Sequence, residues 1–176
     1  MRVEFRAATA DDLQLVHAWL QRPHVKRWWR DRETYEEVVE HYLPSIEGRD
    51  PTDHHVIVLD GEPAGFIQTY LVSDYPDWQR LTGVEDGVAG VDLFLANEDQ
   101  TGHGIGTAVL DGFVRDVVFA TPATIACVAD PDSDNVASLR AFEKAGFFPV
   151  RQFRDPDDGR IHTLVRRERQ STPVTA

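Results

Sequence analysis

The stretch from Gly90 to Thr107 constrains the fold more than any other part of the chain. Its first half, Val91 to Ala96, is a short apolar run with one acid, which is typical of a buried strand. Its second half, Gly102 to Thr107, is a glycine-rich turn, and residues 108–114 then have the apolar spacing of a helix. This order predicts a cradle for an anion, because glycine lets a ligand approach backbone N–H groups and the first helical turn offers unpaired donors.

The spacing excludes two common nucleotide motifs. A P-loop needs Lys-Ser or Lys-Thr after its last glycine, and a dinucleotide fold needs Gly-x-Gly-x-x-Gly early in a βαβ unit. The turn here reads Gly-x-Gly-x-Gly and lies past the middle of the chain. It resembles the acyl-CoA loop of the GCN5-related N-acetyltransferases, the GNAT superfamily. One departure is Thr101, where that family commonly has Arg or Gln, although Gln100 stands just before it.

A second motif, Asn135 to Phe147, strengthens the resemblance. It reads NVASLRAFEKAGF, and the corresponding GNAT segment ends in an aromatic residue followed by Glu-Lys-x-Gly-Phe. In that family an Asn at this position lies beside the pantetheine arm. Gly146 suits the left-handed residue that ends a helix. Since one strand, Ala123 to Ala129, separates the two motifs, they stand in the family's order, and the chain is identified as a member of the superfamily.

Membership implies an α/β (α+β) fold with a mixed, mostly antiparallel sheet of about seven strands and about four helices, in the order β-α-α-β-β-β-α-β-α-β-β. We expect one domain over residues 1–168 and a polar tail over 169–176. The chain pattern places strands at Val3–Ala7, His55–Leu59, Pro63–Val72, Val91–Ala96, Ala123–Ala129, Phe148–Phe153 and Ile161–Arg166. Helices are expected at 13–20, Glu33–Ile46, 108–114 and within 135–147, with a long loop from Ser73 to Gly87.

Charge and cysteine content limit the class of partner. The chain has 30 acidic and 18 basic residues, a formal charge of −12, which argues against nucleic acid and favours a cationic small molecule. No apolar run approaches the length of a membrane span, and the N-terminus lacks a signal region. The single cysteine, Cys127, excludes an internal disulfide and fits a core position in a cytoplasmic protein. A monomer and a homodimer both remain open.

Further segments narrow the resemblance to the aminoglycoside 6′-N-acetyltransferases, which move an acetyl group from acetyl-CoA to the 6′-amine of the antibiotic. These segments are His17-Ala18-Trp19-Leu20, Trp28-Trp29, Tyr42 to Ser45, Gly61 to Tyr70 and Gly90 to Asn97. A sister group that acylates hydroxylysine-type amines in siderophore synthesis shares the Trp-Trp region. That group typically has His where this chain has Asp92, so the acid favours the aminoglycoside interpretation.

The resemblance implies acetyl-CoA as the cosubstrate and no metal, and the seven histidines show no metal-ligand spacing. The residues expected at acetyl-CoA are Leu93, Phe94, Leu95, Gln100, Thr101, Gly102, His103, Gly104, Ile105, Gly106, Thr107, Asn135 and Ser138. A backbone N–H in Leu93 to Leu95 would stabilise the oxyanion of the acetyl carbonyl.

A polycationic acceptor needs several carboxylates and flat surfaces for sugar rings. The residues expected to bind it are Trp28, Trp29, Gln68, Tyr70, Asp74, Asp77, Trp78, Glu85, Asp92, Asp130 and Asp158. Acids of the 73–87 loop could equally form a solvated face. Of the two tryptophans, one is expected in the core and the other in the cleft.

Asp92 is the candidate catalytic residue, because it is the only acid in an apolar strand and a buried charge is costly without a purpose. The family often supplies a Tyr hydroxyl to the leaving thiolate. Here Phe142 stands at that position, which leaves the general acid open between water, another side chain and release of the thiolate. Two other functions also remain open: acylation of a siderophore precursor or polyamine, and a non-catalytic CoA-binding sensor.

Overall fold

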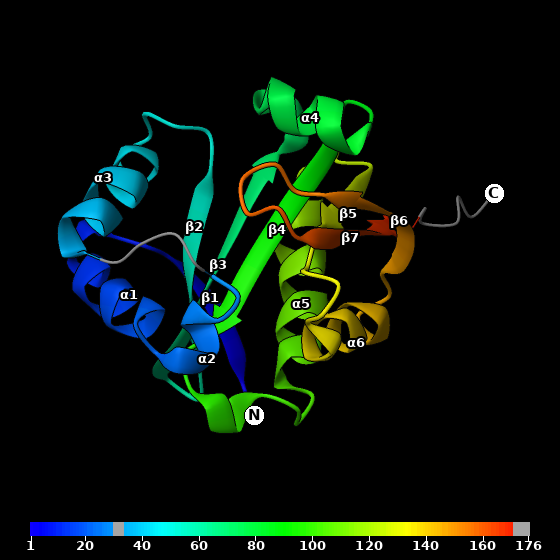
Figure 1. The fold of residues 1–176 in the computed structure, drawn as a ribbon. Coiled ribbons are helices and arrows are strands. Elements are labelled where there is room, and N and C mark those ends of the chain that lie inside the picture. The colour runs from blue at the N-terminus through cyan, green and yellow to red at the C-terminus, as the bar shows by residue number, and fades with distance from the viewer. Residues whose placement is uncertain (30–33, 171–176) are drawn as a thin grey trace.

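The computed structural model describes residues 1–29 and 34–170. One seven-stranded sheet, in the order β1-β2-β3-β4-β5-β7-β6, runs through the whole molecule (Figure 1). All neighbouring strands are antiparallel except β4 and β5, which run parallel. The strands are β1 (Val3–Ala7), β2 (Asp53–Leu59), β3 (Glu62–Leu71), β4 (Val88–Leu95), β5 (Ala126–Ala129), β6 (Phe148–Arg154) and β7 (Ile161–Glu168). The predicted fold class, a mixed and mostly antiparallel sheet with helices, is confirmed.

The described residues form six α-helices where about four were predicted. They are α1 (Leu13–Leu20), α2 (Pro23–Lys26), α3 (Tyr35–Ile46), α4 (Pro76–Thr82), α5 (Ile105–Asp116) and α6 (Val136–Lys144). The two additional helices, α2 and α4, both begin at a proline, whose fixed φ suits the first helical position. The prediction of a loop over residues 73–87 was therefore wrong for Pro76–Thr82, which form α4. Gly83, with φ of 69°, ends that helix in the left-handed conformation.

Element boundaries around the glycine turn also differ from the prediction. Helix α5 begins at Ile105, three residues before the predicted start at 108, and β4 begins at Val88 instead of Val91. Only Gly102 and Gly104 in this turn have positive φ, at 79° and 81°. Because glycine is a poor helix former, the sequence pattern assigned the first turn of α5 to the loop. Glu33, the predicted start of α3, lies outside the described residues.

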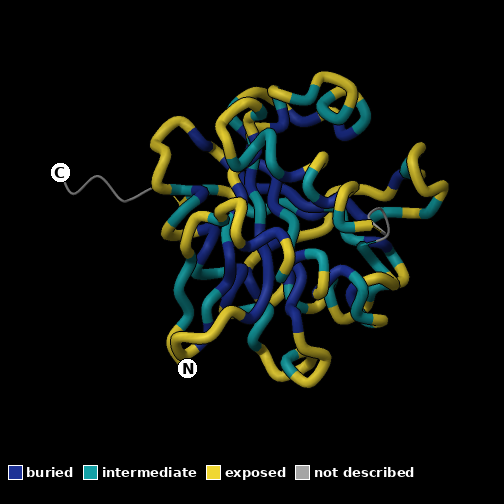
Figure 2. The backbone as a smooth tube through the Cα atoms, turned by 90° about the vertical axis from the view of Figure 1, so that its left-hand side faces the viewer, coloured by how far each residue is buried: buried dark blue, intermediate teal, exposed yellow. Residues whose placement is uncertain are grey.

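The sheet has a buried core on each face, visible as the dark interior of Figure 2. On one face, α5 and α6 cover a cluster that includes Ile67, Val91 and the buried Cys127. On the other face, α1 and α3 cover a cluster around Phe66 and Phe94. A third cluster lies at the far end of that second face, where residues of α4 pack on β4, β5 and β7. None of the described helices combines the length and apolarity that a membrane span requires.

Two features of this arrangement position the site. Strand β4 pairs with β5 only at Val88, Ala89 and Gly90, so within the described residues the edge of β4 from Val91 onward has no neighbouring strand on that side. On the second face, Gln68 and Asp92 lie between the cluster under α1 and α3 and the cluster under α4. The sheet therefore offers an open backbone edge and a polar surface on the same strand.

Candidate active site

The glycine turn leads into the N-terminus of α5, as an anion cradle requires. Gly104 is the N-cap residue, and the first helical hydrogen bond runs from the Ala108 N–H to the Gly104 carbonyl at 3.1 Å. The N–H groups of Ile105, Gly106 and Thr107 precede that bond and have no partner within the helix. Since Gly102, His103 and Gly104 are exposed, a phosphate in solution can reach these donors.

Two side chains before the turn have different environments. The Thr101 hydroxyl donates to the Glu98 carbonyl at 2.6 Å, so it stabilises the short turn that precedes the glycines. The Gln100 Oε1 atom is buried and has no hydrogen-bond partner among the described residues. The Thr101 hydroxyl is therefore already occupied within the protein, and the Gln100 side-chain oxygen is shielded from solvent.

Beyond Gly90, where β4 no longer pairs with β5, the free edge of β4 presents alternate backbone groups to the gap between the two strands. The Ala96 N–H donates to the Ala64 carbonyl of β3 at 2.8 Å. In an antiparallel ladder the direction alternates, so the N–H groups of Leu93 and Leu95 point to the open edge. Phe94 instead directs its N–H toward β3, and its ring lies 5.1 Å from the Trp29 ring in the core. Of the three predicted residues, Leu93 and Leu95 can meet a ligand at the edge, while Phe94 is a core residue.

Helix α6 borders the other side of the gap. Asn135 is its N-cap, and its side-chain oxygen accepts the Ser138 N–H at 3.2 Å, so its amide nitrogen can donate to a ligand. A Cβ added to Gly106 would lie 3.7 Å from the Ala141 Cβ, which shows how closely α5 approaches α6. Phe142 is buried, with its ring 5.0 Å from the Phe147 ring. The predicted cofactor residues thus converge from β4, α5 and α6.

Asp92 is the central acid of the second face. It is paired in register with Gln68, whose Nε2 donates to the Asp92 carboxylate at 3.0 Å. This hydrogen bond explains how an acid is tolerated in an apolar strand. The Gln68 Oε1 atom is buried and has no hydrogen-bond partner within residues 1–29 and 34–170. The pair therefore holds the Asp92 carboxylate through the Gln68 amide nitrogen, while the Gln68 oxygen is turned into the protein.

Tyr70 lies two residues after Gln68 on β3 and is paired in register with Gly90 of β4. A Cβ on Gly90 would come within 2.3 Å of the Tyr70 ring, so glycine makes the space that this ring occupies. Burial, followed by the nearby charges of Asp92 and Asp130, raises the pKa of Tyr70 well above its usual value. The hydroxyl is therefore neutral even well above neutral pH and can donate a hydrogen bond.

His162 joins the two acids that the sequence assigned to the last part of the site. Its Nδ1 lies 3.0 Å from an Asp130 carboxylate oxygen and its Nε2 lies 3.1 Å from an Asp158 carboxylate oxygen. These hydrogen bonds raise the pKa of His162 to about 9, so the ring is an imidazolium at neutral pH. The ring also belongs to both groups of side chains whose spacing would suit a metal ion, and in this structure it pairs with carboxylates of both groups. Sequence reasoning missed His162, although its position beside the Asp-rich hairpin was the available signal.

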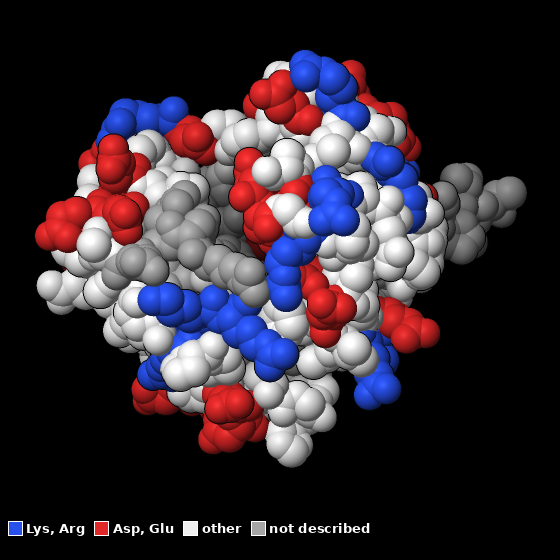
Figure 3. Space-filling model, in the orientation of Figure 1, with Lys and Arg blue, Asp and Glu red and all other residues white. Residues whose placement is uncertain are grey.

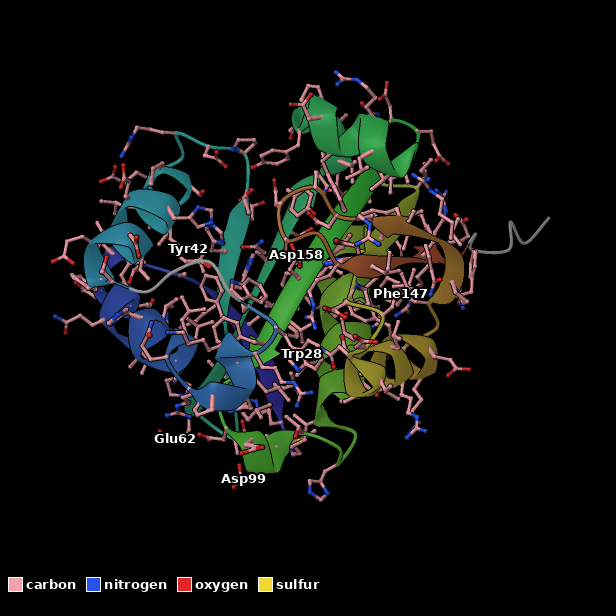
Figure 4. All side chains as sticks on the ribbon, viewed as in Figure 1. Trp28, Tyr42, Glu62, Asp99, Phe147 and Asp158 are labelled. Atoms are coloured by element: carbon pink, nitrogen blue, oxygen red, sulfur yellow. The ribbon has the colours of Figure 1, made fainter. Side chains whose placement is uncertain are left out.

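The two tryptophans have different positions. The Trp29 indole N–H donates to the Tyr42 hydroxyl at 3.2 Å, and its ring packs on the core beneath α3. The Trp28 ring instead has two cations near it, with the Arg27 guanidinium 4.8 Å and the Arg160 guanidinium 5.5 Å from its centroid. Figure 4 labels Trp28 and Asp158, which both lie in front of β4. Trp28 therefore belongs to the polar face, and Trp29 to the core.

A cavity of about 740 Å³ separates α4 from the β6–β7 hairpin. Predicted residues Asp74, Asp77 and Trp78 line one wall, and the hairpin residues Asp155, Pro156 and Asp157 line the other. Figure 3 shows acidic side chains gathered around this hairpin and on α4.

Glu85 does not share this cavity. Its carboxylate forms two hydrogen bonds with the Arg166 guanidinium, at 2.8 and 2.9 Å, and this cation lowers the pKa of Glu85. Most of the predicted acceptor residues thus fall into three groups: Asp74, Asp77 and Trp78 at this cavity, Gln68 with Asp92, and Asp130 with Asp158 around His162.

This geometry can be compared with known proteins. A family model described as an acetyltransferase (GNAT) domain matches residues 8–155. The chain belongs to the GNAT acetyltransferase family. Its relatives include the aminoglycoside N(6′)-acetyltransferase type 1 of Klebsiella pneumoniae, 33% identical over 171 residues, which are 94% of this chain and 84% of the relative. A kanamycin resistance protein of Rhizobium radiobacter is 32% identical over 52% of this chain and 82% of its own length.

Solved structures agree with this assignment. The structure of AAC(6′)-Ib with paromomycin and acetyl-CoA is 31% identical to this acetyltransferase, covers 100% of both chains and has a TM-score of 0.88. The same enzyme with coenzyme A and kanamycin is 32% identical, covers 96% of this chain and 95% of its own, and has a TM-score of 0.86. The predicted family and its acetyl-CoA-dependent N-acetyltransferase activity are confirmed.

Proposed function

We propose that this acetyltransferase acetylates the 6′-amino group of aminoglycoside antibiotics and so confers resistance to them. The proposal rests on β4, which has an open backbone edge beside the α5 cradle and carries Asp92 on its second face, the face on which Tyr70 and Trp78 also pack. The first feature suits an acyl-CoA and the second suits a polycation with sugar rings. The relatives named as aminoglycoside 6′-acetyltransferases support the same substrate class.

On the cofactor side, the diphosphate would lie on the N–H groups of Gly102 to Thr107, where the α5 dipole favours negative charge. The two pantetheine amides can complete the open edge of β4, with the Asn135 amide beside them. The Leu93 or Leu95 N–H is then placed to donate to the acetyl carbonyl oxygen as negative charge develops on it. His103 is exposed beside the cradle and can contact the same ligand, and Gln100 can do so through its amide nitrogen, since its side-chain oxygen is buried.

On the acceptor side, Asp92 would hold the substrate ammonium and receive a proton from it, directly or through one water. The neutral amine then attacks the thioester carbon, the carbon–sulfur bond breaks, and coenzyme A leaves without a covalent enzyme intermediate. Gln68 orients the Asp92 carboxylate through its 3.0 Å hydrogen bond. Phe142 provides no hydroxyl at the position where the family often has Tyr, so the thiolate takes its proton from water or another side chain, or leaves unprotonated.

The rest of the acceptor surface would bind the antibiotic's other groups. Trp28, Tyr70 and Trp78 offer flat faces to sugar rings, and the acids Asp74, Asp77, Asp130 and Asp158 pair with ammonium groups. Because the donor is acetyl-CoA and the only cysteine is a buried thiol, we place the protein in the cytoplasm.

Thiol release from acetyl-CoA tests the proposal. We expect turnover with kanamycin and tobramycin and none with hydroxylysine or spermidine at matched concentration. Turnover with hydroxylysine or spermidine but not with kanamycin would identify a siderophore or polyamine N-acyltransferase instead. Binding of coenzyme A without turnover of any amine would identify a sensor. Mass spectrometry of acetylated kanamycin, with NMR assignment of the modified nitrogen, checks the 6′ position.

A further inference from the structure

Arg160 extends from the β6–β7 hairpin across the acceptor surface. Its guanidinium forms an ion pair with Asp132, in the loop between β5 and α6, and lies 5.5 Å from the centroid of the Trp28 ring. Trp28 follows α2, so this one cation connects the N-terminal and C-terminal parts of the chain. The backbone of Arg160 is held as well, because its N–H donates to an Asp158 carboxylate oxygen at 2.7 Å.

Asp132 depends on a cation in this position. Its side chain is only 9% exposed, and one of its carboxylate oxygens accepts the Asp134 N–H at 2.8 Å. A carboxylate removed from water is costly when no charged partner accompanies it. A cation beside Asp132 therefore stabilises it, and in this structure that cation is Arg160.

The Arg160 guanidinium has the chemistry of the proposed substrate. It is a cation with N–H donors, it pairs with a carboxylate, and it lies over an aromatic ring. A sugar ammonium makes the same two contacts, with a carboxylate and with an aromatic face. The other side chains that face this place are His162, which is already paired with Asp130 and Asp158, and Asp155 of the same hairpin. Arg160 consequently occupies the one position here where a second cation would be stabilised by Asp132.

We propose that Arg160 is a specificity-determining residue that competes with the cationic acceptor and that an aminoglycoside ammonium displaces it from Asp132 and Trp28. This inference rests on the proposed function. The exchange replaces one cation by another, so Asp132 stays paired throughout. The affinity for a polyamine that reaches Asp132 is reduced by the ion pair it must break. A small monoamine that reaches only Asp92 leaves Arg160 in place and gains nothing from its removal.

The test compares Arg160→Ala with the wild type in calorimetric titrations of tobramycin. Removal of this largely buried ion pair and of the cation–π contact from the free protein should tighten tobramycin binding about fivefold. The Kd for acetyl-CoA should stay unchanged, and Arg160→Lys, which keeps the ion pair, should bind tobramycin like the wild type. Arg2→Ala is the control for net charge, because Arg2 is 77% exposed beside β1, at the opposite edge of the sheet, and its loss should leave tobramycin affinity unchanged.

The double variant Arg160→Ala with Asp132→Asn separates competition from folding. It removes the buried carboxylate along with its partner, so it should fold at least as well as the single variant and should lose the gain in affinity. Equal or weaker tobramycin binding by a folded Arg160→Ala protein would overturn the inference and leave Arg160 as a structural partner of Asp132. Wild-type turnover of kanamycin is measured first, since its absence would refute the proposed function and not the role of Arg160.

Discussion

The cofactor side and the acceptor side of β4 offer different kinds of groups to a ligand. The cofactor side consists mostly of backbone groups, namely the N–H donors of the α5 N-terminus and the open strand edge. The acceptor side consists of side chains from β3, β4, the α4 region, the β5–α6 loop and the β6–β7 hairpin, many of them already paired with one another. The difference indicates that the cofactor side tolerates many side-chain changes, whereas each change on the acceptor side redistributes charge among several neighbours.

The largest expected effect comes from the one side chain that the chemistry needs. Asp92→Asn keeps a group that can hydrogen-bond to Gln68, so the variant should fold and bind acetyl-CoA normally. It should lose at least about 100-fold in kcat/KM for kanamycin, the lower range for a positioned acid–base group. Asp116→Asn, an exposed acid of α5, is the matched control. A kcat/KM near that of the wild type in Asp92→Asn would remove Asp92 from the mechanism.

The next prediction tests the backbone character of the cofactor side. Gly104 has φ of 81° and open space around its missing side chain. Asn and Asp tolerate this conformation about equally, so they differ there mainly in charge. Gly104→Asp should weaken coenzyme A binding about tenfold more than Gly104→Asn, because its carboxylate would face the phosphates. Isothermal titration checks both variants, and equal affinities for the two would show that the diphosphate lies elsewhere.

The salt dependence should distinguish the two sides. The acceptor side binds through charged side chains that are partly exposed, so KM for kanamycin should rise several-fold between about 50 mM and about 500 mM NaCl. Wild type and the double variant Asp74→Asn with Asp77→Asn are compared, and the variant should show the shallower dependence. A KM that does not change with salt in the wild type would contradict the electrostatic account of substrate binding.

The smallest effect concerns His162 and the pH dependence of stability. Its pKa is about 9 in the folded protein and 6.5 as the ordinary value, so the stabilisation by its charge is complete below pH 6.5 and is lost as pH rises through about 9. Thermal melts at pH 6 and pH 9.5 should show a larger drop in Tm for wild type than for His162→Gln. A difference of about 3 °C would correspond to roughly 1 kcal/mol in a protein of this size. Parallel losses in both proteins would mean that His162 is not held as an imidazolium.

The contrast between a cofactor side made of backbone groups and an acceptor side made of paired side chains also explains which features the sequence could predict. The cradle, the order of strands and Asp92 are local patterns, since glycine spacing and apolar periodicity lie within short segments. The partners of the acids are not local. Nothing in the segment around Glu85 indicates Arg166, and nothing near Trp28 indicates Arg160, because only the tertiary fold brings these distant segments together. Helix α4 was missed for a different reason: its residues Pro76 and Asp77 are also common in turns.

The open edge of β4 has a consequence for how much folded protein a cell retains. An unpaired strand edge is a template on which another chain can add a strand, and natural sheets usually pair, shorten or charge such edges. Here acetyl-CoA would take the place of the missing strand. A ligand that binds only the folded protein stabilises that protein, and the stabilisation grows with the logarithm of the ligand concentration. The abundance of the resistance protein should then follow the metabolic supply of acetyl-CoA: starved cells would clear or aggregate the empty form, and growing cells would retain it.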